Sequence, residues 1–180
     1  MFENMKKPAT FKKGQPSLGL NAFLQRMQDN GYEFLTQVTV FTGNRTVLLQ
    51  SEELSISLPC EIGINGFAEY DQSFEGDKKT PLCETKVRHI DLPIQDINNK
   101  IASAITKTTE SSISFGPCFI CLYITVPNTE KVRGIGFHGC DDDSDGVLHP
   151  TDGCIRMFNA DLLLIRKLFY KNLKILIKHG

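Results

Sequence analysis

Short runs of apolar and β-branched residues, separated by turn residues, predict a chain rich in strands. Between positions 35 and 64 the sequence reads LTQVTVFT, RTVLLQ, LSISL and CEIGI, and the GN pair at 43–44 marks a tight turn between the first two runs. Runs of this length and alternation are typical of half-buried strands. We predict a hairpin from the first two runs, and strands at 35–42, 45–50, 54–58, 60–64, 83–92, 118–126, 132–138 and 173–179.

Three other segments have the spacing of helices. Ser17 opens an apolar pattern that stops at Gly31, and Pro93 begins a segment with apolar residues at 94, 97, 101 and 105. Asn159 can cap a third helix over 160–172, whereas 67–81 is polar and turn-rich and predicts a loop. Many short strands with few helices favour a mainly β fold: a β-sandwich or barrel of short mixed strands with a few peripheral helices.

Composition narrows the function classes. A length of 180 residues suits one domain with a sizeable core, and we expect a flexible tail at 1–14 followed by a single domain at 15–180. The net charge of −1 provides no basic field for nucleic acid, and no apolar run is long enough to span a bilayer. The first residues carry lysines without an apolar stretch behind them, so we expect no secretory signal in this chain. That leaves a cytoplasmic protein, export without a leader, or a leader already removed.

Four of the six cysteines have apolar surroundings. Cys118 and Cys121 lie in the β-type run CFICLYITV, where residues three apart point to opposite faces. Such a pair cannot chelate zinc as a knuckle does, because a knuckle needs a turn between its ligands. We therefore predict small core side chains at Cys60, Cys83, Cys118 and Cys121.

The densest polar stretch, residues 136–157, carries the candidate chemistry. Cys154 follows Gly153, and a glycine backbone lets main-chain N–H groups turn towards one point, as an oxyanion hole requires. His138 ends the strand predicted at 132–138, and alternation puts it on a face shared with glycines, where a substrate could approach. A cysteine needs a base to become a thiolate near neutral pH, and a Cys–His pair supports acyl transfer through a thioester.

The same stretch also permits two metal sites and a plain solvated turn. An EF-hand-like spacing of acidic residues would give calcium ligands at Asp141, Asp143, Asp145 and Asp152. The flanks, however, are a strand and a turn rather than two helices. A zinc set would use His138, Cys140, His149 and Cys154, without a recognisable ligand spacing. A solvated turn is the simplest interpretation of Asp142, Ser144 and His149.

The stretch resembles the active-site signature of the L,D-transpeptidase catalytic domain, the YkuD-type family. The similarity rests on "HG", a loop, and then "TDGCIRM". Weaker similarities at 39–51, 75–81 and 119–128 extend it over roughly residues 35 to 178. The matched signature positions are His138, Gly139, Thr151, Gly153, Cys154, Ile155, Arg156 and Met157.

The resemblance implies an enzyme that acts on peptidoglycan stem peptides in the periplasm or cell wall, without a metal or cofactor. Cys154 would form a thioester with His138 as its base, the Gly139 carbonyl would orient the imidazole, and the Gly153 and Cys154 N–H groups would hold the oxyanion. Thr151, Asp152 and Arg156 would bind substrate, although Arg156 could equally brace the loop. The reaction would be transpeptidation, exchange with free D-amino acids or L,D-carboxypeptidation, and carbapenems would be covalent inhibitors.

Two departures from the family pattern and three rival interpretations remain. Asp152 stands where the commonest motif has a second histidine, and Cys83 stands where many members have glycine. The rivals are a non-catalytic peptidoglycan-binding module with a calcium loop, a leaderless antibacterial effector, and a papain-like peptidase. A papain-like peptidase would have its catalytic cysteine before its histidine in the chain, whereas here His138 precedes Cys154. For the acidic loop we favour a charged lid that attracts a cationic amine over a calcium site, formed by Asp141, Asp142, Asp143 and Asp145.

Overall fold

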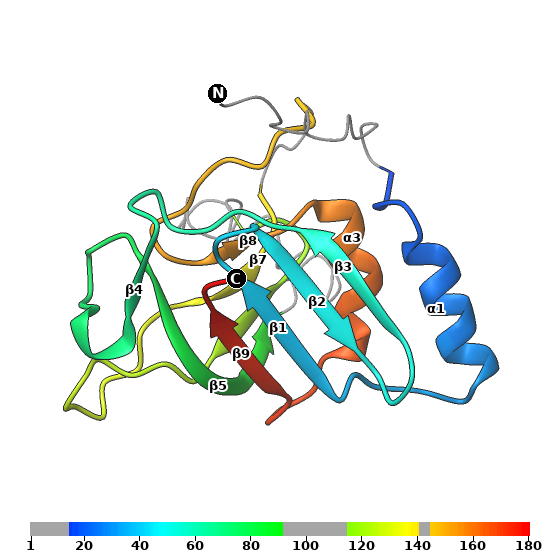
Figure 1. Ribbon diagram of the computed structural model, residues 1–180, viewed down its shortest axis with the longest axis horizontal. Coiled ribbons are helices and arrows are strands. Elements are labelled where there is room, and N and C mark those ends of the chain that lie inside the picture. The colour runs from blue at the N-terminus through cyan, green and yellow to red at the C-terminus, as the bar shows by residue number, and fades with distance from the viewer. Residues whose placement is uncertain (1–14, 92–114, 141–144) are drawn as a thin grey trace, which may run out of the picture.

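The computed structural model describes residues 15–91, 115–140 and 145–180 (Figure 1). The predicted tail at 1–14, the whole helix predicted from Pro93 and residues 141–144 of the acidic loop lie outside these described ranges. In chain order the elements are α1 (Leu20–Asp29), β1 (Gln37–Phe41), β2 (Thr46–Gln50), β3 (Ser55–Pro59), β4 (Phe67–Glu69), the 3-10 turn η1 (Tyr70–Gln72), β5 (Thr80–Asp91), β6 (Phe119–Leu122), β7 (Gly136–His138), β8 (Ile155–Arg156), α3 (Asn159–Ile165), the 3-10 turn η3 (Arg166–Leu168) and β9 (Lys174–Lys178).

The described strands form one mixed sheet in the order β3-β2-β1-β9-β5-β6-β7-β8, with β4 paired to β5. Pairs β1–β9, β4–β5 and β7–β8 are parallel, and the others are antiparallel. Just beyond β3, Glu61 forms an antiparallel bridge with Arg156 of β8 through two backbone hydrogen bonds of 2.9 and 2.8 Å. This bridge joins the two ends of the strand order, so the mainly β fold predicted from the sequence is confirmed, with barrel-like closure.

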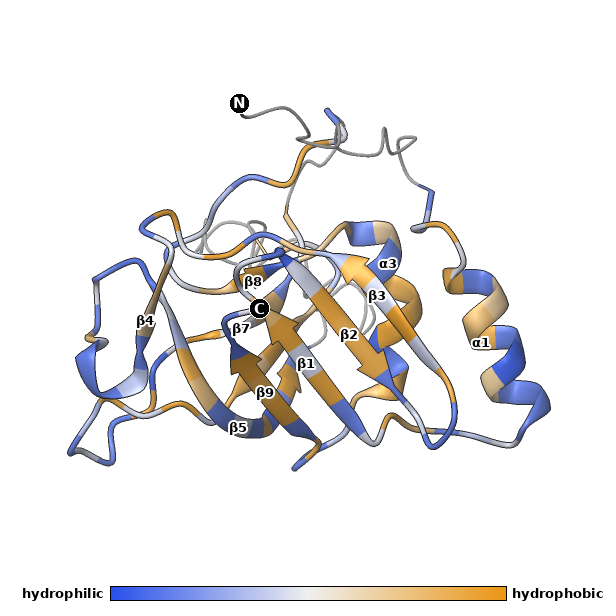
Figure 2. Cartoon of the chain, in the orientation of Figure 1, coloured by the Kyte–Doolittle hydropathy of each residue, from blue (hydrophilic) through white to orange (hydrophobic). Residues whose placement is uncertain are grey.

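Strand alternation explains the core. In β1, Val38 and Val40 are fully buried, and they pair with the equally buried Leu49 and Val47 of β2. On the other side of β1 they face Ile175 and Ile177 of β9. Figure 2 shows these three strands as the most apolar part of the sheet. Each such aliphatic side chain contributes about 1.5–3 kcal/mol when it leaves water.

Helix α1 packs through one face against this core. Its buried residues Leu20, Phe23 and Met27 follow the i, i+3, i+7 spacing of a helical stripe. Ser17 precedes the helix and donates from its backbone N–H and its hydroxyl to the buried Asp161 of α3, at 2.6 and 2.5 Å. The hydroxyl thus ties α1 to α3. Gly31 follows the helix end with a positive φ of 73°, as the stop signal predicted.

Several predicted boundaries are wrong. The 45–50 run is paired as a hairpin with the first run, but in its turn the left-handed residue is Arg45 rather than Gly43 or Asn44. Residues 60–64 form isolated bridges instead of a strand, because their partners are loop and edge residues on the far side of the sheet. The loop predicted at 67–81 contains β4 and η1, and the strand predicted at 83–92 starts earlier, at Thr80.

The last helix and two strands are also shorter than predicted. The runs 118–126 and 132–138 pair regularly only over β6 and β7, and the helix over 160–172 reduces to α3 and η3. Cys60, Cys118 and Cys121 are buried as predicted, Cys83 is partly buried, and all six cysteines are free thiols. Within the described ranges, no helix is long and apolar enough to cross a membrane.

Candidate active site

Adjacent parallel strands β7 and β8 bring the candidate histidine and cysteine onto one face. Phe137 pairs with Ile155 and both side chains are fully buried in the core, so the next pair, His138 and Arg156, faces the other way. By the same alternation Cys154, two residues before Arg156, shares the face of His138. Such diagonal neighbours have Cα atoms roughly 8 Å apart, within reach of an imidazole and a thiol.

His138 is held in one orientation inside an aromatic enclosure. Its Nδ1 lies 2.6 Å from the Gly139 carbonyl oxygen, which can only accept, so Nδ1 carries the proton and Nε2 keeps a free lone pair. The Phe115 ring packs edge-on at 5.1 Å and the Phe119 ring stacks at 6.1 Å. Burial, together with the smaller effect of the Arg156 charge, lowers the pKa of His138 to about 4 against the opposing hydrogen bond to Gly139. The imidazole is therefore a neutral base at physiological pH.

Asn159 fixes the strand end that carries His138. Its side-chain oxygen accepts from the Cys140 N–H at 3.0 Å, and its amide donates to the Cys140 carbonyl at 2.8 Å. A Cβ on Gly139 would collide with that side-chain oxygen, which explains the glycine after the histidine. The expectation that Asn159 caps the following helix is wrong: Phe158 is the N-cap residue and no side chain caps the helix.

Cys154 lies half-buried with its thiol pointing to the segment ahead of β7. Its Sγ donates to the Gly134 carbonyl at 3.5 Å, beside a Gly134 Cα that has open space around it. Burial raises the pKa of Cys154 to about 11, although the Gly136 backbone and the Arg156 charge oppose this. The described residues show no hydrogen bond between Cys154 and His138. The unliganded site thus holds a neutral thiol and a neutral imidazole on one face of the sheet.

The turn before Cys154 depends on Thr151 and Gly153. The Thr151 hydroxyl accepts from the Gly153 N–H at 3.1 Å and donates to the Cys154 carbonyl at 2.7 Å, so this predicted substrate-binding hydroxyl is engaged within the loop. Gly153 has a φ of 120°, and a Cβ there would lie 2.9 Å from the Lys79 carbonyl oxygen. Of the two predicted oxyanion donors, only the Cys154 N–H lacks an acceptor among the described residues.

The segment after β3 and the first residue of β5 hold this turn in place through hydrogen bonds. Thr151 donates its N–H to the Ile62 carbonyl at 3.0 Å, and its own carbonyl accepts from the Ile64 N–H at 2.8 Å. The fully buried Thr80 hydroxyl donates to the Gly153 carbonyl at 2.9 Å and accepts from the Gly63 N–H at 3.0 Å. Three segments that are distant in the sequence therefore share one hydrogen-bonded junction beside the candidate nucleophile.

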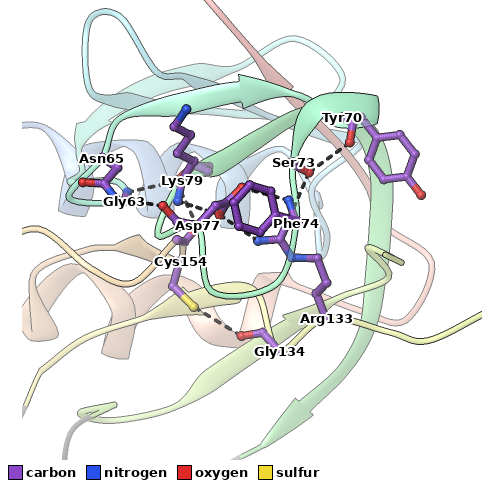
Figure 3. A network of polar contacts seen from close by, with 12 residues as sticks. Gly63, Asn65, Tyr70, Ser73, Phe74, Asp77, Lys79, Arg133, Gly134 and Cys154 are labelled. Carbon is purple, nitrogen blue, oxygen red and sulfur yellow. Dashed lines mark hydrogen bonds and ion pairs between the residues drawn. The ribbon is translucent and has the colours of Figure 1, made fainter. Parts of the chain in front are cut away.

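A buried ion pair that sequence reasoning missed supports the same junction (Figure 3). Arg133 and Asp77 have side chains only 4% and 2% exposed and lie 3.3 Å apart. Arg133 also donates to the Ser73 hydroxyl at 2.9 Å, and Asp77 accepts from the Phe74 and Lys79 N–H groups, each at 2.9 Å. The pair folds residues 73–79 into a tight turn whose end, Lys79, lies against Gly153.

Arg156 makes one hydrogen bond to the loop before Cys154, and another of its donors has no partner in the described structure. Its Nη1 donates to the His149 carbonyl at 3.1 Å, and the exposed His149 ring pairs with Asp145 at 2.6 Å. Its Nε is buried without a hydrogen-bond partner in the described structure. Asp152, by contrast, is largely exposed and pairs with Lys78. The guanidinium thus braces the loop, and one of its donors has no hydrogen-bond partner within the described structure.

The described residues hold no group of three or more His, Cys, Asp or Glu side chains arranged to share a metal ion. The four candidate zinc ligands, His138, Cys140, His149 and Cys154, are therefore not brought together. Of the candidate calcium ligands, Asp141 and Asp143 lie outside the described residues, Asp145 pairs with His149, and Asp152 pairs with Lys78.

Comparison with known proteins supports the fold alone. No family model and no curated protein sequence matches the chain. Among solved structures, the helical cell shape determining protein Pgp2 from Campylobacter jejuni has a TM-score of 0.52 at 17% identity over 89% of this chain. L,D-transpeptidase 3 from Mycobacterium tuberculosis has a TM-score of 0.50 at 10% identity over 79%. A mutant L,D-transpeptidase from Enterococcus faecium has a TM-score of 0.50 at 10% identity over 80%.

The chain therefore has the L,D-transpeptidase-type fold expected from its signature. It spans 55%, 60% and 50% of the lengths of these three structures, so it corresponds to about half of each.

Replacement of His138 by glutamine should remove part of the pH dependence of stability. Burial keeps the folded-state pKa of His138 at about 4, below its ordinary value of 6.5, so the unfolded chain takes up a proton first as pH falls. The neutral, buried imidazole therefore contributes its full stabilisation above about pH 6.5. Up to about 3 kcal/mol of the unfolding free energy is lost as pH falls towards 4. Urea unfolding at pH 7 and pH 4 should show a smaller loss for His138→Gln than for the parent. His149→Gln, at an exposed position, is the control and should retain the parental loss; equal losses in all three proteins would contradict the assignment.

Disruption of the buried ion pair should destabilise the protein and disorder the site. Arg133→Met leaves the Asp77 carboxylate buried without its counter-charge, which typically costs about 3–5 kcal/mol. The double variant Arg133→Met/Asp77→Asn should recover part of this loss, as a double-mutant cycle of unfolding free energies would show. The control is Lys131→Met, which breaks the exposed Lys131–Glu75 pair and should change stability little. A loss for Arg133→Met no larger than for Lys131→Met would show that the buried pair is dispensable.

Proposed function

We propose that the chain is a cysteine acyltransferase that acts on peptidoglycan stem peptides in the periplasm or cell wall. The observation that carries the proposal is the pairing of β7 with β8. It puts His138, with its Nδ1 committed to the Gly139 carbonyl, on the same face as Cys154. The fold, shared with L,D-transpeptidases, supports the choice of peptidoglycan as substrate.

Acylation begins from the neutral pair. When a stem peptide binds, His138 Nε2 takes the thiol proton while Cys154 Sγ attacks the carbonyl carbon of the third stem residue. The Cys154 N–H, which has no acceptor within the described chain, donates to the developing oxyanion. Collapse of the tetrahedral intermediate breaks the peptide bond, and His138 returns its proton to the departing D-alanine amine. A thioester on Cys154 remains.

Deacylation transfers the acyl group to an amine or to water. An amine acceptor gives a cross-link or exchange with a free D-amino acid, and water gives L,D-carboxypeptidase activity. In either case His138 takes a proton from the attacking group and passes it to the departing sulfur. His138 serves both steps because Asp152 replaces the second histidine of the common motif.

Arg156 is suited to a substrate carboxylate. Its Nε is buried without a partner, and an unpaired buried donor costs about 1–3 kcal/mol. A carboxylate at this point would satisfy the donor with a charge-assisted hydrogen bond. The bond between its Nη1 and the His149 carbonyl would hold the guanidinium in place meanwhile.

One observation favours a second candidate, a module that binds peptidoglycan without turnover. The raised pKa of Cys154, about 11, and the bond from its thiol to Gly134 keep the sulfur protonated in the unliganded state. A binding module would need no thiolate. The two candidates differ in whether Cys154 becomes acylated.

Covalent labelling separates them. The parent protein should gain the mass of one carbapenem. Cys154→Ala should abolish both this adduct and the conversion of disaccharide tetrapeptides, because the proposed oxyanion donor is the N–H of the same residue, whereas Cys121, which alternation puts on the same face, is buried. Intact-protein mass spectrometry and chromatography of muropeptides would measure both. Cys118→Ala is the control and should label fully, since Cys118 is buried in the core. Full labelling of Cys154→Ala would refute the assignment of the nucleophile, and parent protein that binds muropeptides without an adduct would favour the binding module.

A further inference from the structure

A pair of opposite charges lies at the rim of the candidate active site. Lys78 Nζ is 3.4 Å from Asp152 Oδ1, with side chains 50% and 79% exposed. Asp152 is two residues before Cys154 in the chain. Lys78 is two residues before Thr80, whose hydroxyl bonds to the Gly153 carbonyl. Asp152 is thus part of the turn that carries Cys154, and Lys78 belongs to the segment that is hydrogen-bonded to that turn.

The backbone beneath Lys78 is rigidly held although its side chain is in solvent. Lys78 has a φ of 57°, a left-handed conformation that few residues other than glycine and asparagine adopt. Its carbonyl accepts from the Asn65 N–H at 3.2 Å, and Asp77 accepts from the N–H groups of Phe74 and Lys79 on either side of it. Because Arg133 pairs with Asp77, the buried ion pair fixes the point from which the lysine extends.

The ion pair itself is easily opened. A solvent-exposed pair of this kind contributes only about 0–1 kcal/mol, since water and salt screen both charges. A ligand that carries an ammonium and a carboxylate on one carbon can replace it with two contacts of matching sign. Glu75 of the same turn forms a similar exposed pair with Lys131, and within the described residues no hydrogen bond or ion pair joins either of them to the Thr151–Cys154 turn.

We propose that Lys78 and Asp152 form an acceptor subsite for an amino-acid head group, in which Asp152 binds the ammonium and Lys78 binds the carboxylate. This inference rests on the proposed acyl transfer and specifies its acceptor. Two sources share the chemistry: a free amino acid, and a stem diaminopimelate whose distal carbon bears both groups. A stem lysine offers an amine without the neighbouring carboxylate and should be a poor acceptor.

The transfer balances without a further reactant. The bound ammonium loses one proton to solvent, and the resulting amine nitrogen attacks the thioester carbonyl on Cys154. The C–N bond forms, the C–S bond breaks, and the second proton passes through His138 to the sulfur. The products are an amide, the free thiol and one proton. Asp152 holds the nitrogen next to the thioester, and Lys78 selects acceptors that retain a carboxylate.

Competition between acceptors tests the subsite. The protein would be supplied with a disaccharide tetrapeptide as donor and either D-methionine or D-methioninamide as acceptor, and mass spectrometry would give the ratio of aminolysis to hydrolysis. We expect D-methionine to be preferred by about fivefold, the upper limit for one contact to a half-exposed charge. Lys78→Met should reduce the preference to within about twofold, and Asp152→Asn should lower the aminolysis ratio for both acceptors. Lys131→Met is the matched control and should keep the parental preference.

Further acceptors distinguish the two sources. Tripeptide muropeptides with diaminopimelate or with lysine at the third position would replace the methionine compounds. Preference for the diaminopimelate form assigns the subsite to cross-linking, and use of D-methionine alone assigns it to exchange; both results support the subsite. Equal use of D-methionine and its amide by a parent protein that forms the thioester would overturn the subsite and leave the proposed function intact.

A binding measurement that needs no catalysis separates failure of the proposed acyl transfer from failure of the acceptor subsite. In Cys154→Ala, D-methionine should shift the NMR signals of the Asp152 and Lys79 amides, and D-methioninamide should not. If the parent forms no thioester, the proposed acyl transfer fails, and selective shifts in Cys154→Ala would still support a zwitterion site. Absence of selective shifts would overturn the subsite independently of any turnover.

Discussion

The buried ion pair between Asp77 and Arg133 is the constraint on which the site depends. Two charges removed from water must satisfy each other and their remaining hydrogen-bonding groups, because an unpaired one is costly. Here the pair ties the turn at 73–79 to the strand segment that leads into β7. The end of that turn lies against Gly153, and Thr80 bonds to its carbonyl. The position of Cys154 therefore follows from an interaction made by residues that need not touch a substrate.

The electrostatics of the site favour a nucleophile that is inactive until substrate arrives. Burial lowers the pKa of His138 to about 4 and raises that of Cys154 to about 11, so neither group is charged near pH 7. In the proposed acylation, the proton would then move within the bound complex, where substrate would exclude water and the Cys154 N–H would meet the oxyanion. The Arg156 charge adds to the lowering of the His138 pKa and opposes the raising of the Cys154 pKa, because it disfavours an imidazolium and favours a thiolate.

Local patterns predicted most of the strands and the glycine-lined face of His138, because alternation and turn residues are encoded by neighbours in the sequence. The signature around Cys154 predicted the L,D-transpeptidase-type fold. Contacts between distant residues could not be predicted in this way. Nothing near Asp77 identifies Arg133 as its partner, Asn159 reads as a helix cap but bonds to Cys140, and residues 60–64 read as a strand but clamp the Thr151 turn. The chemical roles of the site residues remain predictions.

The central claim is that Cys154 is acylated by a stem peptide, and rapid quenching tests it most directly. Protein mixed with a disaccharide tetrapeptide and quenched in acid within one turnover should carry an adduct equal to the donor minus D-alanine. Peptide mapping should locate that adduct on Cys154, and neutral hydroxylamine should release it, as expected for a thioester. Donor consumption without an adduct on Cys154, or an adduct on any other cysteine, would contradict the account.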